Sequence, residues 1–470
     1  MCFICARGLS RRGFLQGAAA LGAAGLASRP LLAQPAPATA GGLPARGEFV
    51  VRNAYVMSMD AKIGDMPDAD IHVRDGAIVA VGPGLQAPGA EIIDARDMIA
   101  LPGLIDTHWH MWGTSARNTA GDTPKMGYFT FAKVVGSIFN AEDNARGVRL
   151  AIAEAIDSGL TTVHNWSHNL VTPEFADAEL QAHAQMGHRA LFGYGYFGIG
   201  MRDQTVRVED LPRVLDRWIQ PSEGLLTLGV CSRGPENNGI ELCRGEWEAA
   251  RKLGLRISTH VGTSAPRVKE RQAIKQLAKA GLLGDDVILV HQTNTVDDDS
   301  ETLARTGTHV SLSPYTEMRT GFGFPPMAEL EKAGVPLSLS VDTSVLAGNC
   351  DMFAIMKAIH NVANAEKKSE FAMPVRRVLE MATMGGARAL GIADRVGSLT
   401  PGKRADLILV RTTDVNMAPF TDPEHMVVQS ANPSNVDTVV IDGRILKRAG
   451  RLVGVDVKKI VADANDTAKR

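Results

Sequence analysis

The chain has 470 residues, enough for one large domain and a smaller one with an ample buried core. Its 50 Lys and Arg residues nearly balance its 52 Asp and Glu residues, and aromatic residues make up only 5 % of the chain. The balance of charge gives no basis for a nucleic-acid or acidic-polymer partner, and the few aromatic residues argue against base stacking.

The N-terminal segment differs in composition from the rest. Residues 10–16 hold paired arginines followed by Phe-Leu, and residues 17–27 form a small, apolar run. This pattern resembles a bacterial twin-arginine export signal, with residues 31–33 or 38–40 as alternative cleavage zones. We expect residues 1–40 to be such a signal, which implies the twin-arginine export machinery as a partner and a periplasmic or secreted protein. The alternative is a disordered tail, and the apolar run is too short for a stable membrane anchor.

The cysteines do not form a disulfide framework. Cys2 and Cys5 lie in the expected signal, which leaves Cys231, Cys243 and Cys350. An odd and sparse set of this kind does not indicate a fold stabilised by disulfide bonds, although the periplasm would permit one disulfide.

Both ends of the remaining chain are predicted to be rich in β-strands. Short runs of β-forming residues occur at 48–52, 71–74 and 77–81, and Asp-Gly between the last two is a hairpin signal. Similar runs occur at 406–410 and 437–441.

The middle of the chain alternates between strand-type and helix-type segments. Helical patterns include residues 147–158, 246–253 and 374–390. The strand candidates are 99–107, 161–165, 188–194, 225–231, 255–260, 287–291, 309–313 and 337–342. Eight strands in β/α alternation predict an α/β fold, the TIM (β/α)8 barrel.

Several of these strands end in a side chain that can bind a metal ion. His108 and His110 are two residues apart at the end of the first strand, so both imidazoles can point to one face. His260, His291 and Asp342 end three later strands. The C-terminal strand ends are where TIM barrels place their active sites. Imidazole and carboxylate ligands suit Zn²⁺ and also admit Fe²⁺, Mn²⁺ or Co²⁺.

Other side chains are candidates for the wall of a substrate pocket. His164, Trp166 and His168 follow the second strand, and Trp166 could stack on a planar substrate. Trp112 precedes a long insertion, residues 113–146, which could cover the pocket. Ordinary packing is the alternative for these residues. Thr263, three residues after His260, is a further candidate for the pocket wall.

Three segments identify a family resemblance. Residues 101–110 (LPGLIDTHWH), 159–163 (GLTTV) and 396–408 (VGSLTPGKRADLI) resemble signatures of the amidohydrolase superfamily. The resemblance covers most of the chain after residue 47. Within the superfamily the chain is most similar to the branch of cytosine and S-adenosylhomocysteine deaminases and triazine hydrolases.

This resemblance implies a barrel over residues 98–396 and a small β-sandwich that residues 47–97 and 397–455 form together. It also implies one divalent metal ion, most commonly zinc, held by four side chains: His108, His110, His260 and Asp342. His291 would then contact the metal-bound water or the substrate.

The expected chemistry is attack by a metal-activated water. A divalent metal lowers the pKa of bound water toward ~7. Asp342 can accept the water's proton, and His291 can hydrogen-bond the developing oxyanion.

Two departures from the deaminase pattern bear on the reaction. Deaminases of this branch place Glu three residues after the strand-five His, but Thr263 stands there. Glu317 could serve as acid or substrate ligand instead, or it could be a solvated loop carboxylate. The fourth strand ends in Cys231 with no Lys nearby, so a lysine-bridged pair of metals is not expected. Cys231 is interpreted as a buried thiol, with a second-metal ligand as the alternative.

These features predict an exported, metal-dependent hydrolase of non-peptide carbon–nitrogen bonds in a small-molecule substrate. The alternatives are a deaminase or dechlorinating hydrolase of N-heterocycles, an ester or lactone hydrolase, and an inactive metal- or ligand-binding periplasmic protein. If the chain forms an oligomer, we expect a homodimer.

Overall fold

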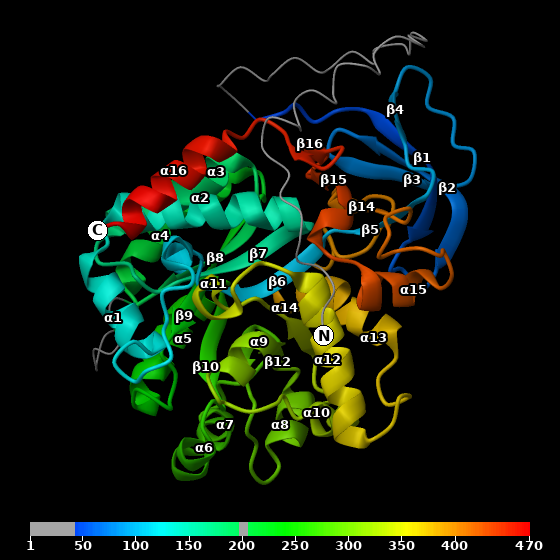
Figure 1. Ribbon diagram of the computed structural model, residues 1–470. Coiled ribbons are helices and arrows are strands. Elements are labelled where there is room, and N and C mark those ends of the chain that lie inside the picture. The colour runs from blue at the N-terminus through cyan, green and yellow to red at the C-terminus, as the bar shows by residue number, and fades with distance from the viewer. Residues whose placement is uncertain (1–42, 197–204) are drawn as a thin grey trace, which may run out of the picture. The chain divides into compact units, whose positions relative to one another are not determined.

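The computed structural model describes residues 43–196 and 205–470 (Figure 1). The export signal predicted over residues 1–40 lies outside the described residues. Within the described part of the chain, no helix is both long and apolar enough to cross a membrane.

Eight parallel strands form the barrel, each hydrogen-bonded to the next in chain order. They are β6 (Leu104–Trp109), β7 (Leu160–Ser167), β8 (Arg189–Gly195), β9 (Leu226–Ser232), β10 (Arg256–Val261), β11 (Val287–His291), β12 (His309–Leu312) and β13 (Leu337–Leu339). A bridge between Trp109 and Asp342 brings the last strand back to the first. The predicted α/β barrel is therefore confirmed.

Strands from both ends of the described chain combine in one nine-stranded mixed sheet. They are β1 (Phe49–Met57), β2 (Asp65–Arg74), β3 (Ala77–Gly82), β4 (Glu91–Asp94), β5 (Met98–Pro102), β14 (Leu407–Arg411), β15 (Val436–Ile441), β16 (Arg444–Arg448) and β17 (Arg451–Leu452). The two ends meet where β14 pairs antiparallel with β5 (Figure 1). This sheet is the separate β-domain expected beside the barrel.

Helices follow most barrel strands and lie around them (Figure 1). The α-helices are α1 (Tyr128–Ile138), α2 (Ala141–Ser158), α3 (Pro173–Met186), α4 (Leu211–Val214), α5 (Ile240–Lys252), α6 (Ala265–Arg271), α7 (Ala273–Lys279), α8 (Asp299–Thr306), α9 (Pro314–Arg319), α10 (Met327–Ala333), α11 (Ser344–Ala347), α12 (Met352–Lys367), α13 (Val375–Glu380), α14 (Gly386–Ala389), α15 (Pro423–His425) and α16 (Val457–Ala468). Shorter 3-10 and π segments are η1 (Met111–Ala116), η2 (Val208–Asp210), η3 (Leu215–Ile219), η4 (Gln220–Ser222), η5 (Met381–Gly385), η6 (Met426–Ser430) and η7 (Pro433–Asn435).

Local sequence explains how α2 begins and ends. Asn140 caps it and forms a reciprocal capping box with Asp143. Gly159 ends it at φ 89°, a left-handed conformation that glycine adopts without steric cost. The chain therefore turns directly from the helix into β7.

The predicted single strand over residues 99–107 is wrong, because the chain changes sheets in the middle of the apolar run. β5 belongs to the mixed sheet, and β6 starts the barrel after Gly103. The amide of Gly103 donates to the carbonyl of Asp406, and a Cβ at this position would lie 2.0 Å from Oγ1 of Thr161. Only glycine fits the crossing point, and hydrophobicity alone cannot reveal the change of partner.

Asp106 joins the first and last barrel strands. Its Oδ1 accepts from the amide of His108 at 2.9 Å, and its Oδ2 accepts from the amide of Val341 at 2.7 Å. The amide of Asp342 donates to the carbonyl of His108 at 2.8 Å. Two candidate metal ligands are therefore fixed to each other through the backbone.

A buried carboxylate also links helices and strand beside the barrel. Glu179 on α3 accepts hydrogen bonds from Asn144 at 2.9 Å, Asn165 at 3.0 Å and Ser167 at 2.9 Å. Burial raises the pKa of Glu179 to about 7. The folded protein therefore keeps this proton at pH values where the unfolded chain, with an ordinary Glu pKa, has lost it.

Glu179 is expected to make the protein less stable as pH rises. The stability that Glu179 contributes is fully present below the pKa that Glu has in the unfolded chain. It falls by about 3 kcal/mol as pH rises from there through about 7, the pKa of Glu179 in the folded protein. Glu179→Gln removes this titration. Urea unfolding of both proteins between pH 4.5 and 8 measures it. Stability curves that run parallel across this range would show that Glu179 does not titrate as described.

Candidate active site

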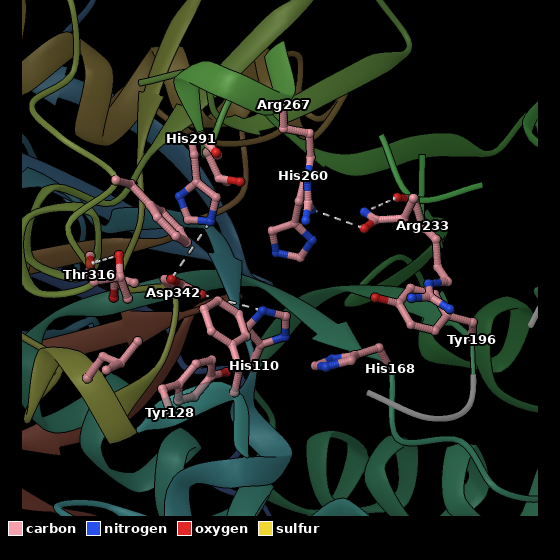
Figure 2. A pocket seen from close by; sticks show the side chains of 17 residues that line it. His110, Tyr128, His168, Tyr196, Arg233, His260, Arg267, His291, Thr316 and Asp342 are labelled. Atoms are coloured by element: carbon pink, nitrogen blue, oxygen red, sulfur yellow. Dashed lines mark hydrogen bonds and ion pairs between the residues drawn. The ribbon is translucent and has the colours of Figure 1, made fainter. Parts of the chain in front are cut away.

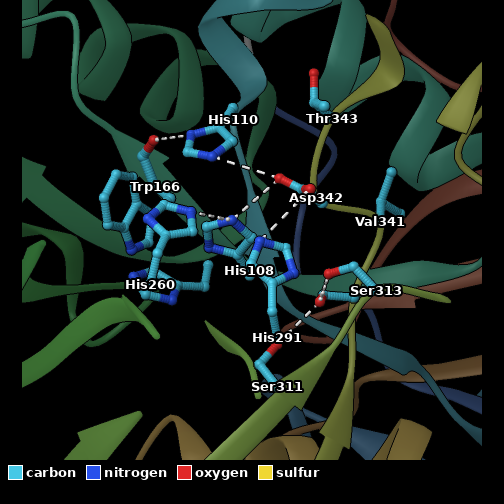
Figure 3. Close-up of polar contacts among 12 residues, drawn as sticks. His108, His110, Trp166, His260, His291, Ser311, Ser313, Val341, Asp342 and Thr343 are labelled. Atoms are coloured by element: carbon cyan, nitrogen blue, oxygen red, sulfur yellow. Dashed lines mark hydrogen bonds and ion pairs between the residues drawn. The ribbon is translucent and has the colours of Figure 1, made fainter. Parts of the chain in front are cut away.

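Four predicted ligands converge at the C-terminal end of the barrel (Figure 3). Their ligand atoms all lie within 4.8 Å of one another. Nε2 of His108 is 3.2 Å from Oδ1 of Asp342 and 3.2 Å from Nε2 of His260. Nε2 of His110 is 3.4 Å from the same carboxylate oxygen.

These residues fit a divalent metal ion. A tetrahedral site with metal–ligand bonds of about 2.0–2.1 Å has ligand atoms roughly 3.3 Å apart, close to the three separations given above, and the other pairs lie within 4.8 Å. Burial lowers the pKa of His108, His110 and His260 well below the usual value, so each imidazole is neutral and offers a lone pair.

Supporting contacts orient the ligand rings. Nδ1 of His110 donates to the carbonyl of Trp166 at 3.2 Å, which leaves Nε2 facing the centre (Figure 3). The Trp166 ring packs edge-on against His108, His110 and His260, and its Nε1 donates to Ser258. Trp166 therefore supports the ligands and does not line the cavity.

His291 and Glu317 form a buried pair beside the ligands. His291 ends β11, and its Nδ1 is 3.2 Å from Oε1 of Glu317, which also accepts from the amide of Ser313 at 2.8 Å. Burial disfavours the imidazolium, but the hydrogen bond to Glu317 and the nearby carboxylates raise the pKa of His291 above its usual value. Nε2 of His291 is 4.0 Å from Oδ2 of Asp342, beyond hydrogen-bond distance, so the ring faces Asp342 across the site.

Glu317 lies behind His291 as seen from the cavity. It is fully buried on α9 and is absent from the lining of the cavity. The interpretation of Glu317 as an acid or substrate ligand does not match this position, because a side chain behind His291 cannot reach a bound molecule. Its solvated-loop alternative is excluded by its burial.

Asp342 follows β13 with a backbone φ of 66°, a left-handed conformation that Asp tolerates better than most residues. Burial raises the pKa of its carboxyl group. Asp342 is the only carboxylate among the described residues that line the cavity. It combines the positions expected of a ligand and of a base.

A cavity of about 420 Å³ opens over these groups (Figure 2). It is lined by His110, Tyr128, Phe129, His168, Tyr196, Arg233, Asn237, His260, Thr263, Ser264, Arg267, His291, Thr316, Thr320, Phe322, Asp342 and Leu346. Tyr128 and Phe129 come from the long insertion after the first barrel strand.

The structure separates the predicted pocket residues into two groups. His168 and Thr263 line the cavity. Trp112 lies behind His168 and donates to its Nδ1 at 3.4 Å. His164 is buried beneath the site, with Nδ1 3.0 Å from the carbonyl of Thr107 and Nε2 3.6 Å from Sγ of Cys231. Trp112 and His164 therefore pack beside the site and do not line the cavity, which matches the packing alternative and not the predicted pocket role.

The cysteines play no part in the ligand cluster. Cys231, Cys243 and Cys350 are free and buried, and burial raises the pKa of each thiol. Cys231 is absent from the only ligand cluster found among the described residues. The described residues therefore offer one cluster that fits a metal ion.

Sequence reasoning missed two cationic residues of the cavity. Arg233 directly follows β9, and Arg267 lies on α6. The rule that located the metal ligands, a functional side chain at the end of a barrel strand, points equally to Arg233. Arg267 carries no such signal, because its position depends on the path of a loop.

The fold and ligand set define a metal-dependent hydrolase with a TIM barrel. Residues 99–446 match the amidohydrolase family, and the chain belongs to this family. It is 29 % identical over 434 residues to a 5-methylthioadenosine/S-adenosylhomocysteine deaminase of Desulforudis audaxviator, covering 90 % of this chain and 98 % of the relative. It is also 29 % identical over 430 residues to a 5'-deoxyadenosine deaminase of Methanosarcina mazei, with the same coverage.

Solved structures show the same fold. An adenosine deaminase from Xanthomonas campestris with bound zinc superposes with a TM-score of 0.83 at 26 % identity, over 91 % of this chain and 99 % of that one. An atrazine chlorohydrolase from Arthrobacter aurescens complexed with zinc gives a TM-score of 0.81 at 23 % identity, over 89 % and 100 %. The predicted class, a metal-dependent hydrolase of carbon–nitrogen bonds, is confirmed.

Proposed function

We propose that the chain is a zinc hydrolase of amide-type carbon–nitrogen bonds, such as those of amides, carbamates or cyclic ureas. Thr263 carries the proposal, because it lines the cavity where the resemblance places the proton-shuttling Glu of deaminases. The zinc in solved relatives and the three-imidazole, one-carboxylate ligand set support zinc as the metal.

The requirement for proton transfer separates the two reactions. Attack of water on an aromatic ring carbon needs a proton delivered to a ring nitrogen, and the leaving amine needs another. A Thr hydroxyl cannot supply a proton at neutral pH. Hydrolysis of an amide-type bond requires one group that takes a proton from water and returns it to the leaving nitrogen. Among the described cavity residues, Asp342 is the one carboxylate able to do so.

His108, His110, His260 and Asp342 would hold the metal, which supplies a nucleophilic water at neutral pH. Asp342 takes the proton from the attacking water and passes it to the leaving nitrogen. His291, oriented by Glu317, donates a hydrogen bond to the oxyanion that develops on the carbonyl oxygen. Tyr128 and Phe129 add aromatic surface to the cavity wall beside these groups.

The test compares substrate classes on the zinc-loaded protein. We expect at least one amide, carbamate or cyclic urea to be hydrolysed with kcat/KM about 10²-fold above any adenine nucleoside or aminotriazine, consistent with the loss of one general acid. Thr263→Glu should raise deamination relative to amide hydrolysis. Faster deamination by the unchanged protein would contradict the proposal.

The second candidate is deamination or dechlorination of an N-heterocycle. The relatives favour it, since they include adenosine-type deaminases and an atrazine chlorohydrolase. An inactive binding protein is the third. The complete ligand set and the His291–Glu317 pair support an active enzyme over it.

We also propose that the protein is exported through the twin-arginine route. The Arg11-Arg12 pair, the apolar run and the small-residue cleavage zone after it support this proposal. Replacing both arginines with lysine is expected to hold the precursor in the cytoplasm, as measured by cell fractionation. Unchanged export of the double variant, or a native protein found only in the cytoplasm, would contradict it.

A further inference from the structure

One wall of the cavity carries two guanidinium groups that the proposed hydrolytic mechanism does not use. Arg233 and Arg267 both line the cavity, and Figure 2 shows Arg233 beside Tyr196, on the opposite side from Asp342. We propose that they form a subsite for a carboxylate group on the substrate. The identity of the bond that is cleaved rests on the proposed function, but the binding of the carboxylate does not.

Arg233 packs against Tyr196, and one of its nitrogens has no partner among the described residues. Its guanidinium carbon lies 5.1 Å from the centroid of the Tyr196 ring, a cation–π contact that fixes the plane of the group. Nη1 of Arg233 is buried and has no hydrogen-bond partner among the described residues. A buried donor without a partner costs free energy, so the guanidinium is not fully satisfied by the described residues.

Asn237 couples the two arginines. Its Oδ1 accepts from Nη1 of Arg267 at 3.4 Å, and its Nδ2 donates to the backbone carbonyl of Arg233 at 3.1 Å. Arg267 lies on an exposed part of α6 and reaches the cavity from its rim. The two cations therefore converge from different elements on the same wall.

The acidic residues close to this wall are engaged elsewhere. Oε1 of Glu236 accepts from the amide of Gly262 at 2.9 Å. Glu246 accepts from the amide of Val206 at 2.8 Å and from Oγ of Ser232 at 2.7 Å. Neither glutamate lines the cavity, and no ion pair joins either arginine to a described acidic residue. Both guanidinium groups line the cavity, and each also lies near one buried glutamate, Glu246 near Arg233 and Glu236 near Arg267.

The chemistry of the two groups selects a planar anion. A guanidinium offers paired N–H donors whose spacing matches the two oxygens of a carboxylate. Because the guanidinium of Arg233 is held over the Tyr196 ring, its orientation favours binding two oxygens of one carboxylate over a single hydrogen bond. We therefore expect the substrate to carry a carboxylate on the side remote from the bond that reacts.

Binding of two probes without any carbon–nitrogen bond tests the subsite. Calorimetry on the zinc-loaded protein should show 3-phenylpropionate binding about tenfold or more tighter than the neutral 3-phenylpropanol, consistent with about 1.4 kcal/mol per tenfold change. Arg233→Met and Arg267→Met should each abolish this preference while zinc content stays the same. Arg271→Met, on the same helix as Arg267 but outside the cavity lining, should retain it.

Equal binding of the two probes would overturn the proposal. A preference that survives in both arginine variants would also overturn it, because the metal centre would then be selecting the anion. If Arg233→Met fails to fold, the exposed Arg267 still provides the test. An anion preference without turnover of any amide contradicts the proposed function alone, whereas amide hydrolysis without an anion preference contradicts the subsite alone.

Discussion

Replacing Asp342 with Asn is expected to lower kcat/KM by about 10³-fold or more, because the substitution removes the only carboxylate among the described cavity-lining residues. It also removes a negative charge from a ligand set that otherwise consists of neutral imidazoles. Zinc binding should therefore weaken as well. Steady-state kinetics and elemental analysis of the purified variant measure the two effects separately.

Asp351→Asn is a matched control for this variant. Asp351 caps α12 by accepting from the amide of Ala354 at 2.9 Å, and Asn caps helices about as well as Asp. The control should keep both zinc and turnover. If Asp342→Asn retained a tenth or more of the activity of the unchanged protein, Asp342 could not be the base.

Replacing His291 with Asn is expected to lower kcat by about 10²–10³-fold while zinc stays bound. The reason is geometric, since His291 stands outside the four-residue ligand cluster but faces Asp342 across the site. This variant separates a group that stabilises the oxyanion from a group that holds the metal. Kinetics and metal content on the same preparation provide the measurement.

Glu317→Gln tests the positioning role in the same assay. It should reduce kcat by about tenfold, with little change in KM. The amide of Gln keeps a contact to the His291 ring, but without a negative charge it orients the ring and favours its protonated form less strongly. His425→Asn, at an exposed position remote from the pocket lining, serves as the control. Loss of zinc in His291→Asn would assign His291 to the ligand set instead.

The ligand set could be predicted from the sequence because each of its members lies at or just past the end of a barrel strand. His260 is on β10, and Asp342 follows β13. Strand ends of a parallel barrel meet at one face whatever the lengths of the loops. Residue type and position were therefore sufficient to predict that these residues, far apart in the sequence, form one site.

The wall of the cavity could not be predicted in the same way. His164, Trp166 and His168 all follow one another on or just after β7, yet only His168 reaches the cavity. Side chains inside a barrel stack in layers, so a residue one layer below the ligands supports them without touching substrate. How far each layer lies below the cavity depends on how the strands are staggered. The hydrophobic pattern of the sequence does not show this stagger.

Glu317 illustrates a second limit. It is buried because α9 places its carboxylate against His291 and the amide of Ser313. A carboxylate in a loop-like stretch of sequence is expected to be exposed to solvent. Only the three-dimensional path of the chain shows that the Glu317 side chain is buried.

The most direct test of the account is a titration of turnover with zinc. The protein is stripped with a chelator and zinc is added back while hydrolysis of the best amide-type substrate is followed. We expect no turnover without metal and a linear rise that saturates at about one zinc per chain. Saturation at two equivalents, or turnover that persists without metal, would contradict a hydrolase built on the single cluster of His108, His110, His260 and Asp342.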